Sequence, residues 1–429
     1  MRCYWSTAGR KSLARSAMIE AAAHFQKGLE LLPGLPDGPD RERQELELQS
    51  ALGRALVASK GPAAPEAGEA YLRARTLCER LDDARSLVPV LMGQFAHRLL
   101  RGELAAARRI AYDLLVSGKI NNDAIARLAG HQAMGSCLHE SGEFIAAIEH
   151  HERVLSLHDP EINWAIASVA AYDPQTIALS LLALDHFAIG NLDQASTCNE
   201  EAVSFSRRLD NHTSLCMALY MSASTNLLRP SEQAAFTALE ELTSIATEQR
   251  FFYFQTVANV PRALLSSKTG SVVEGIARAR ESISALAARG TIHWQAYHLG
   301  LLARACQRAG QSEEALYTLD RALETADRTG ERWFEAELHR LRGEWLIVHR
   351  NGEQAEAEAC FERALAVARR QSAKMWELRA AMSFARLCRG QGRAVEARTL
   401  LAPIYEWFTE GLDAPDLKEA KALLDELTA

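Results

Sequence analysis

Few residues of this 429-residue chain have the types and spacing that nucleotide chemistry requires. The segment AGRKS at residues 8–12 resembles the end of a phosphate-binding loop of the pattern G-x-x-x-x-G-K-S. Tyr4 stands where that pattern has its first glycine, and Arg10 separates Gly9 from Lys11. Because the loop needs its glycines so that backbone N–H groups can surround a phosphate, the segment does not predict a nucleotide site.

Histidines and carboxylates also miss the patterns of metal and catalytic sites. The run HHERVLSLH at residues 150–158 lacks the H-E-x-x-H spacing of a zinc site, and His293 and His298 fall on different faces of a helix. No G-x-S-x-G frame for a nucleophile occurs. Carboxylate pairs such as those of GEQAEAEA have the spacing of a solvated helical face. The sequence therefore predicts a chain that is not an enzyme and that has no catalytic, cofactor-binding or metal-binding residues.

The elements that would position any side chain are revealed by an internal repeat. Counting forward from a turn residue, the residue five positions later is small, and the residues nine and twelve positions later are mostly apolar. After Gly310, for example, these residues are Ala315, Leu319 and Ala322. The ninth position is polar in two units, at His151 and Asn199. Ten such units begin at Ser16, Pro65, Gly102, Gly142, Gly190, Pro230, Gly270, Gly310, Gly352 and Gly392. Self-similarity at such a period indicates a repeat architecture.

Each unit has the pattern of a helical hairpin. Positions spaced by four and three residues lie on one helical stripe, and a small residue there lets another helix approach closely. A glycine turn followed by alanine and then a bulky residue resembles the tetratricopeptide repeat (TPR), although the period exceeds the usual ~34 residues. We therefore expect an all-α, TPR-like, right-handed superhelical solenoid of about ten hairpins. It would form a single domain over residues 1–429, with a hinge or an extra helical turn near 158–174 and a capping helix at 415–428.

Composition limits the partners and the compartment. The net charge of −7 offers no global attraction to nucleic acid or to anionic lipid, so we expect neither partner. The eight cysteines include no C-x-x-C pair, which indicates free thiols in a reducing compartment. No apolar run approaches the ~20 residues that cross a bilayer, and the first residues lack the apolar region of a signal peptide. We expect a cytoplasmic protein.

A solenoid of hairpins presents a concave surface that usually carries the first helix of each unit. Polar or aromatic residues of those helices that lie off the packing stripe are the candidates for binding. The three arginines near the C-terminus have spacings of seven and three, hence share a face, and could receive an acidic peptide or a phosphate by bidentate hydrogen bonds, or form an ordinary solvated face. The candidates are Gln132, Ser136, His139, Tyr297, Arg304, Gln307, Arg379, Arg386 and Arg389.

A more specific resemblance covers essentially the whole chain. The phrases TGERWFEAELHRLRGEWL, AEACFERALAVARRQSAKMWELRAAMSFARL and YDPQTIALSLLALDHFAIGNLDQA resemble the C-terminal TPR region of bacterial multidomain signalling proteins. In that family a class III adenylate or guanylate cyclase is joined to an AAA-type (STAND-like) ATPase and then to the repeats. The sequence lacks the metal-binding aspartates and the phosphate loop of those two domains, so no catalytic residue carries over from the family.

Two functional readings follow. In the first, the chain is a non-catalytic scaffold or regulatory module for signal transduction, which binds a protein, a peptide or a small effector in its groove and regulates a signalling ATPase or cyclase. In the second, it is an accessory or truncated part of a nucleotide cyclase, or of a TPR-containing transcription regulator. The sequence names neither the partner nor the oligomeric state.

Overall fold

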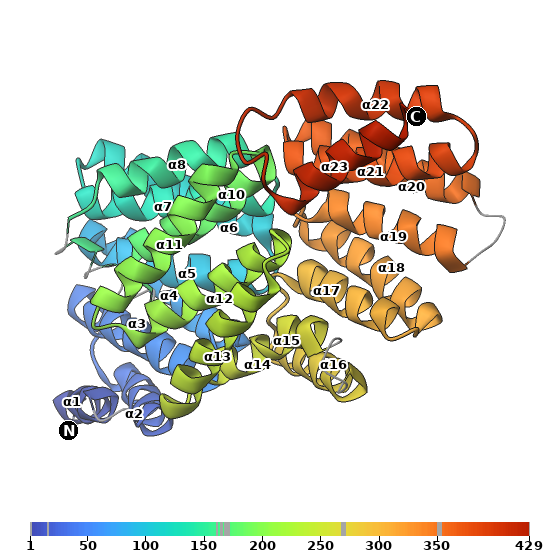
Figure 1. The fold of residues 1–429 in the computed structure, drawn as a ribbon. Helices are drawn as coiled ribbons and strands as arrows, with labels where there is room; N and C mark the ends of the chain where they lie inside the picture. Colours follow the sequence, from blue (N-terminus) through green and yellow to red (C-terminus); the bar gives the residue numbers. More distant parts are fainter. Residues whose placement is uncertain are drawn as a thin grey trace. The chain divides into compact units, whose positions relative to one another are not determined.

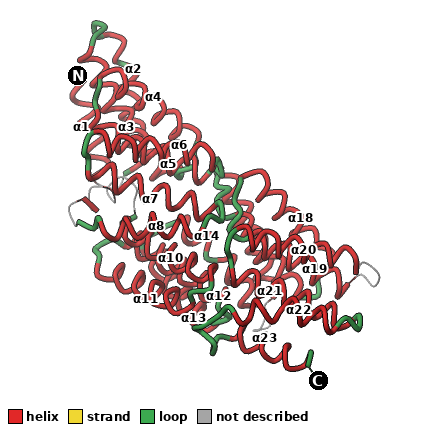
Figure 2. The backbone as a smooth tube through the Cα atoms, turned by 90° about the horizontal axis from the view of Figure 1, so that it is seen from above, coloured by secondary structure: helices red, strands yellow, loops and turns green. Residues whose placement is uncertain are grey.

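The computed structural model describes residues 2–14, 17–159, 162–163, 166, 172–266, 272–349 and 354–428. Within these ranges the chain is helical and contains no β-strand (Figure 2). Consecutive helices pair as the ten repeat units predict, with the second helix of each pair beginning shortly after the turn residue. The predicted all-α, TPR-like class is confirmed.

The chain divides into two compact units. Unit 1 comprises Met1–Met134, Leu157–Pro174 and Leu286–His293, and unit 2 comprises Gly135–Ser156, Gln175–Ala285 and Trp294–Ala429. The helices of unit 1 are α1 (Arg2–Ala14), α2 (Met18–Glu30), the short η1 (Leu32–Gly34), α3 (Pro39–Lys60), α4 (Pro65–Leu81), α5 (Ala84–Leu100), α6 (Leu104–Ile120) and the greater part of α7 (Ala124–Glu140) (Figure 1). Its core is a cluster of small and branched apolar residues around Phe25, Leu48 and Ala67.

Unit 2 contains the end of α7 and most of the remaining helices. They are α8 (Phe144–Ser156), α10 (Pro174–Ile189), α11 (Leu192–Arg208), α12 (His212–Leu228), α13 (Glu232–Glu248), α14 (Phe252–Val257), α15 (Asn259–Ser266), α16 (Val272–Ala288), α17 (Gln295–Arg308), α18 (Ser312–Thr329), α19 (Glu335–His349), α20 (Gln354–Arg370), α21 (Lys374–Gly390), α22 (Ala394–Glu406) and α23 (Pro415–Glu426). Its core is aromatic, with Trp333, Trp376, Tyr297 and Phe334 all buried.

The small residue of the repeat lies where the helices of a hairpin approach each other. A larger side chain there would separate the two helices, so the position is fully buried in the units that carry alanine. Ala70 is 3% exposed, and the alanines of the other units have no exposed surface: Ala21, Ala107, Ala147, Ala195, Ala235, Ala315, Ala357 and Ala397. The repeat pattern therefore marks the packing stripe of the second helices.

The first arm of the seventh hairpin differs from the others because it is broken into α14 and α15. Pro261 lies in the first turn of α15. Proline has no N–H to donate to the carbonyl four residues earlier, and its ring crowds that carbonyl, which favours a break in the helix at this point. Phe254 and Val257 of α14 are buried, so the aromatic run at 250–257 contributes to the core.

The turn glycines of unit 2 have different surroundings. Gly142 and Gly310 both have a positive φ, of 74° and 73°, which glycine adopts without the steric cost of a Cβ. A Cβ on Gly142 would lie 2.1 Å from Nε2 of Gln371, a residue of the α20–α21 turn, whereas a Cβ on Gly310 would meet nothing within 4 Å. The early turn of unit 2 is thus covered by a segment that lies far along the chain.

The sequence predicted a hinge near residues 158–174 and a capping helix at residues 415–428. The expected hinge at 158–174 lies largely outside the described residues. At the other end, α23 buries Leu417, Ala420 and Leu423 and packs on α21 and α22 of unit 2. Its exposed face carries Glu419 and Lys418.

Candidate binding site

The candidates on α7 are buried. His139 has no exposed surface, and Gln132 and Ser136 are 8% and 4% exposed. The His139 ring lies 2.6 Å from Asp185 through Nδ1 and Oδ1. Burial disfavours the charged imidazole, but the carboxylate of Asp185 outweighs it and raises the pKa of His139. The pair links α7 to α10 inside the core of unit 2, so His139 is not accessible to a ligand in this conformation.

The candidates on α17 have three different environments. Tyr297 is fully buried among aromatic rings, 4.9 Å from Trp333 and 5.1 Å from Phe334 between centroids, and burial raises its pKa to about 12. Gln307 is half-buried near the end of the helix. Arg304 is half-buried too, and its guanidinium makes no hydrogen bond or ion pair within the described part of the chain.

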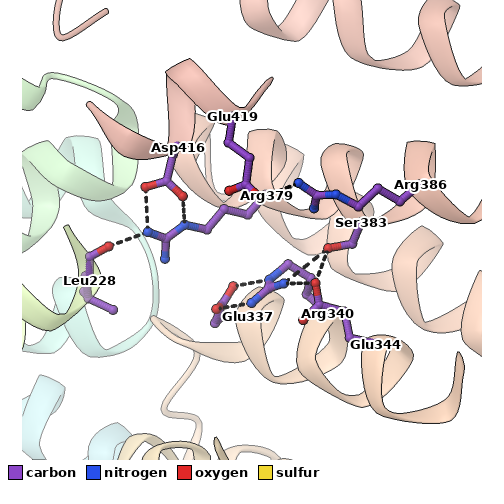
Figure 3. A network of polar contacts seen from close by, with 9 residues as sticks. All are labelled: Leu228, Glu337, Arg340, Glu344, Arg379, Ser383, Arg386, Asp416 and Glu419. Atoms are coloured by element: carbon purple, nitrogen blue, oxygen red, sulfur yellow. Dashed lines mark hydrogen bonds and ion pairs between the residues drawn. The ribbon is translucent and has the colours of Figure 1, made fainter. Parts of the chain in front are cut away.

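The three late arginines share one face of α21, as their spacing predicts, and each of them meets an acidic residue of α23. Figure 3 shows the first two of these pairs, at Arg379 and Arg386. Arg379 binds Asp416 through two hydrogen bonds of 2.8 Å, Nε to Oδ1 and Nη2 to Oδ2. Arg386 Nη2 lies 2.6 Å from Glu419, and Arg389 pairs with Glu426. In this conformation the acidic group that the sequence pattern led us to expect is supplied by the chain itself.

Arg379 also joins α21 to a helix from earlier in the chain. Its Nη2 donates to the carbonyl oxygen of Leu228 at the end of α12 (Figure 3). Its guanidinium lies 5.4 Å from the ring centroids of both Phe187 and Trp376, a distance that allows cation–π attraction. Burial works against the charged form, but Asp416 raises the pKa of Arg379. Arg379 therefore stays charged while it holds three elements of unit 2 together.

A second ion pair lies beside it on α19. Arg340 donates to both oxygens of Glu337 at 2.7 Å, to Ser383 Oγ at 3.2 Å, and pairs with Glu344 at 2.5 Å (Figure 3). The Glu337 side chain is only 2% exposed. Burial favours its neutral form, but Arg340, followed by Arg379 and Arg304, lowers its pKa. Glu337 is thus a buried carboxylate that stays ionised because guanidinium groups surround it.

Arg304 is the member of this group that has no partner of its own. Burial disfavours the charged form of Arg304, and so do the positive charges of Arg340, Arg308 and Arg379. Together these effects outweigh the attraction of Glu337 and lower the pKa of Arg304. The structure thus places two predicted residues, Arg304 and Arg379, in one charged group on α17, α19 and α21. We name this group, with Glu337, Arg340 and Asp416, the arginine network.

Two members of the arginine network, Glu337 and Arg340, were not predicted from the sequence. With Glu344 they have the i,i+3 and i,i+4 spacing of helical ion pairs, which is the one signal that marked them. Such pairs are ordinarily exposed, so spacing alone did not show that these are buried. Asp416 was not among the predicted binding residues either, although it lies in the predicted capping helix.

A cavity of about 450 Å³ adjoins the arginine network through Asp416. We name it the α11–α23 cavity, because α11 and the segment that leads into α23 supply much of its wall. Its polar lining is Asp193, Ser196, Asn199, Glu200, Asn226, Arg229, Ser231, Asp413 and Asp416, and its apolar lining includes Phe187, Leu192 and Met375. Asn199 was not among the predicted binding residues.

The cavity has the size of a small-ligand site, and it collects polar groups from segments far apart in the chain, such as those of Asp193 and Asp413. Arg229 Nη1 donates to Ser196 Oγ at 2.7 Å across its wall.

Among the described residues, no group of three or more histidine, cysteine, aspartate or glutamate side chains is placed to hold a metal ion. Seven of the eight cysteines, from Cys78 to Cys388, are buried free thiols. None of the described helices combines the length and the apolar character needed to cross a membrane.

Comparison with known proteins agrees with the fold. No family model matches the chain. An uncharacterized protein of Rhizobium meliloti (strain 1021) is 23% identical over 370 residues, which are 82% of this chain and 34% of that protein. The chain thus spans 34% of the length of this curated relative.

Solved structures with the same kind of fold share little sequence with the chain. A Rap protein complexed with competence and sporulation factor has a TM-score of 0.53 at 14% identity, over 90% of this chain and 99% of that one. The Rap conjugation gene regulator of plasmid pLS20, in complex with the Phr* peptide, has a TM-score of 0.43 at 11% identity, over 99% of this chain and 96% of that one. The first of these likenesses supports the TPR-like fold and nothing more specific.

Proposed function

We propose that this chain is a non-catalytic binding module that takes up a protein, a peptide or a small effector in unit 2. The observation that carries the proposal is the α11–α23 cavity, because it is large enough for a ligand and its polar lining includes Asp193, Glu200 and Asp413, which make no ion pair within the described part of the chain. The similar Rap protein was solved with competence and sporulation factor bound, which agrees with a binding role for this fold.

The arginine network supports the same proposal. It joins α12, α17, α19, α21 and α23, and Asp416 belongs to both the network and the wall of the cavity. A ligand that moves the segment leading into α23 would also act on the Arg379–Asp416 pair. Binding would thereby favour one arrangement of the helices over another, which is how a module without catalytic groups regulates a partner.

The regulated partner is, in this proposal, a signalling ATPase or a nucleotide cyclase. The resemblance of the repeats to the region that follows such domains supports this choice. The purified chain should then turn over neither ATP nor GTP, and its addition should change the nucleotide turnover of a cyclase–ATPase protein of the resembled family. Turnover by the chain alone would contradict the proposal.

The binding role is tested with a fluorescent hexapeptide library and fluorescence polarisation. Ala234 lines the cavity and is exposed, so Ala234→Trp should fill the mouth of the cavity and weaken binding. Ala355 is an exposed alanine of α20 that does not line the cavity, and Ala355→Trp is the matched control. If no peptide binds the unmodified chain, or if both variants bind as it does, the cavity is not the binding site.

A further inference from the structure

We propose that the α11–α23 cavity selects a cationic group, either an ammonium or a guanidinium. The inference rests on the proposed function, because it names the chemistry that the same cavity recognises. Two sources of such a group fit a cavity of about 450 Å³: a basic side chain of a bound peptide and a free amine.

The charge of the lining favours a cation. Asp193, Glu200 and Asp413 make no ion pair within the described part of the chain, whereas Asp416 is neutralised by Arg379. Arg229 is the one lysine or arginine among the described residues that line the cavity. Three unpaired carboxylates against one guanidinium leave a balance of −2 in the wall, and such a wall attracts a cation and repels an anion.

Asn199 supplies the second observation. Its side chain lines the cavity, the residue is 9% exposed, and its carboxamide forms no hydrogen bond within the described part of the chain. The amide atoms themselves are not fully enclosed, so they remain open to a ligand from the cavity. An N–H donor of a ligand could then bond to the amide oxygen.

The repeat makes this asparagine unusual. Asn199 occupies the position that holds Leu319, Phe361 and Leu401 in the units beginning at Gly310, Gly352 and Gly392. Those three side chains are buried core residues, at 3%, 0% and 0% exposed. Folding alone would therefore favour an apolar residue at position 199. A polar residue at this position gives the cavity a donor and acceptor that the apolar frame would not supply.

A metal ion fits the cavity less well than an organic cation. The described residues contain no cluster of three or more metal-ligating side chains, and the volume is many times that of one ion. An ammonium or a guanidinium can instead donate to several separated acceptors at once, which suits carboxylates spread over α11 and the segment before α23.

The test compares charged and neutral probes of one shape. Isothermal titration of the full chain with Nα-acetyl-arginine amide and with its citrulline analogue isolates the charge, and hexapeptides with a central arginine, citrulline or glutamate do the same for a peptide. We expect the arginine probes to bind at least about tenfold more tightly than the citrulline probes, as for one charge-assisted hydrogen bond. Glu200→Gln should weaken arginine binding, and Glu362→Gln, an exposed change on α20, should not.

Asn199→Leu separates binding from folding. It restores the apolar residue of the repeat, so the melting temperature should rise while binding of the arginine probes weakens by about tenfold or more. A loss of binding in a more stable variant is not explained by unfolding. Unchanged binding by this variant would overturn the assignment of Asn199.

Each combination of results has one meaning. Binding of the free amide and of arginine peptides supports the cation site with a peptide source, and binding of the free amide alone supports it with a free amine as the source. Peptide binding that prefers glutamate, or that does not distinguish arginine from citrulline, overturns the cation site and leaves the proposed binding function standing. If no probe and no library peptide binds, both proposals fall.

Discussion

Arg379 and Asp416 form a bidentate ion pair at 2.8 Å between α21 and α23, with the two side chains 10% and 11% exposed. The neighbouring pair of Arg386 and Glu419 joins the same two helices, but its side chains are 36% and 61% exposed. The first pair is bidentate and buried, and the second has a single contact and is more exposed. They therefore allow a comparison of a buried and an exposed ion pair between the same two helices.

Asp416→Asn should lower the free energy of unfolding by about 2–4 kcal/mol, because it leaves the buried guanidinium of Arg379 without its carboxylate. Glu419→Gln should cost less than about 1 kcal/mol, because water solvates and screens the exposed pair. Chemical denaturation of both variants measures the difference. Equal costs for the two changes would show that the buried pair is not what attaches α23.

Arg304→Met should raise the free energy of unfolding by about 0.5–1 kcal/mol. The guanidinium of Arg304 is half-buried and has no hydrogen bond in the described part of the chain, so a thioether side chain of similar length removes an uncompensated charge. Arg340→Met is the contrasting variant, and it should cost about 2–4 kcal/mol because Glu337 then loses both of its 2.7 Å bonds. A loss of stability in Arg304→Met would show that its attraction to Glu337 outweighs its burial.

Stability should fall in acid because of His151. Burial lowers the pKa of this histidine from 6.5 to about 3, so the folded chain keeps it neutral over a range in which the unfolded chain binds a proton. Above pH 6.5 it is neutral in both states and has no effect. As the pH falls from 6.5 towards 3, the free energy of unfolding should fall by up to about 1.4 kcal/mol per pH unit.

The same effect can be assigned by substitution. His151→Leu places the apolar residue of the repeat at this site and should flatten the dependence of stability on pH between 6.5 and 4. His212 is exposed at the start of α12, and His212→Leu should leave the dependence as it is. Thermal unfolding in a series of buffers gives both curves. An unchanged slope in His151→Leu would mean that another group causes the acid sensitivity.

Gly142→Ala should destabilise the chain more than Gly310→Ala. Both substitutions place a Cβ at nearly the same positive φ, which costs about 1 kcal/mol in each case. At Gly142 the new carbon also displaces the amide of Gln371, which donates to the carbonyl oxygen of Arg332 at 2.8 Å, so about 1 kcal/mol more should be lost. Denaturation of both variants tests the coverage of the early turn, and equal losses would contradict it.

The local elements of this protein could be read from the sequence. The small residue of each unit, such as Ala315 or Ala357, marked the second helix of a hairpin and lies fully buried in the fold. The break between α14 and α15 was not foreseen, although Pro261 is its cause. For the candidate residues, the spacing correctly placed Arg379, Arg386 and Arg389 on one face of a helix, but it did not show which acidic groups lie opposite them.

His139 and Tyr297 show that helical periodicity does not predict which polar side chains are buried. Both are polar side chains on first helices, where the pattern favoured an accessible surface, yet both are fully buried in unit 2. Helical periodicity distinguishes one face of a helix from the other, but it does not show whether the second face is also covered. In unit 2 it is covered by segments far along the chain, as when Arg332 and Trp333 donate to the carbonyl oxygen of Glu140.

The sequence by itself determined which residues form helices, how the helices pair and which positions pack, because those properties depend on neighbours within about 40 residues, as the spacing of the repeat shows. Only the tertiary structure decided which charges meet and where a cavity remains. Arg379 donates to the carbonyl oxygen of Leu228, 151 positions away, and no periodic pattern encodes such a distance. The partners of a buried charge are set by how the packed helices bring distant segments together, and that packing also leaves Asn199 facing a cavity instead of a core.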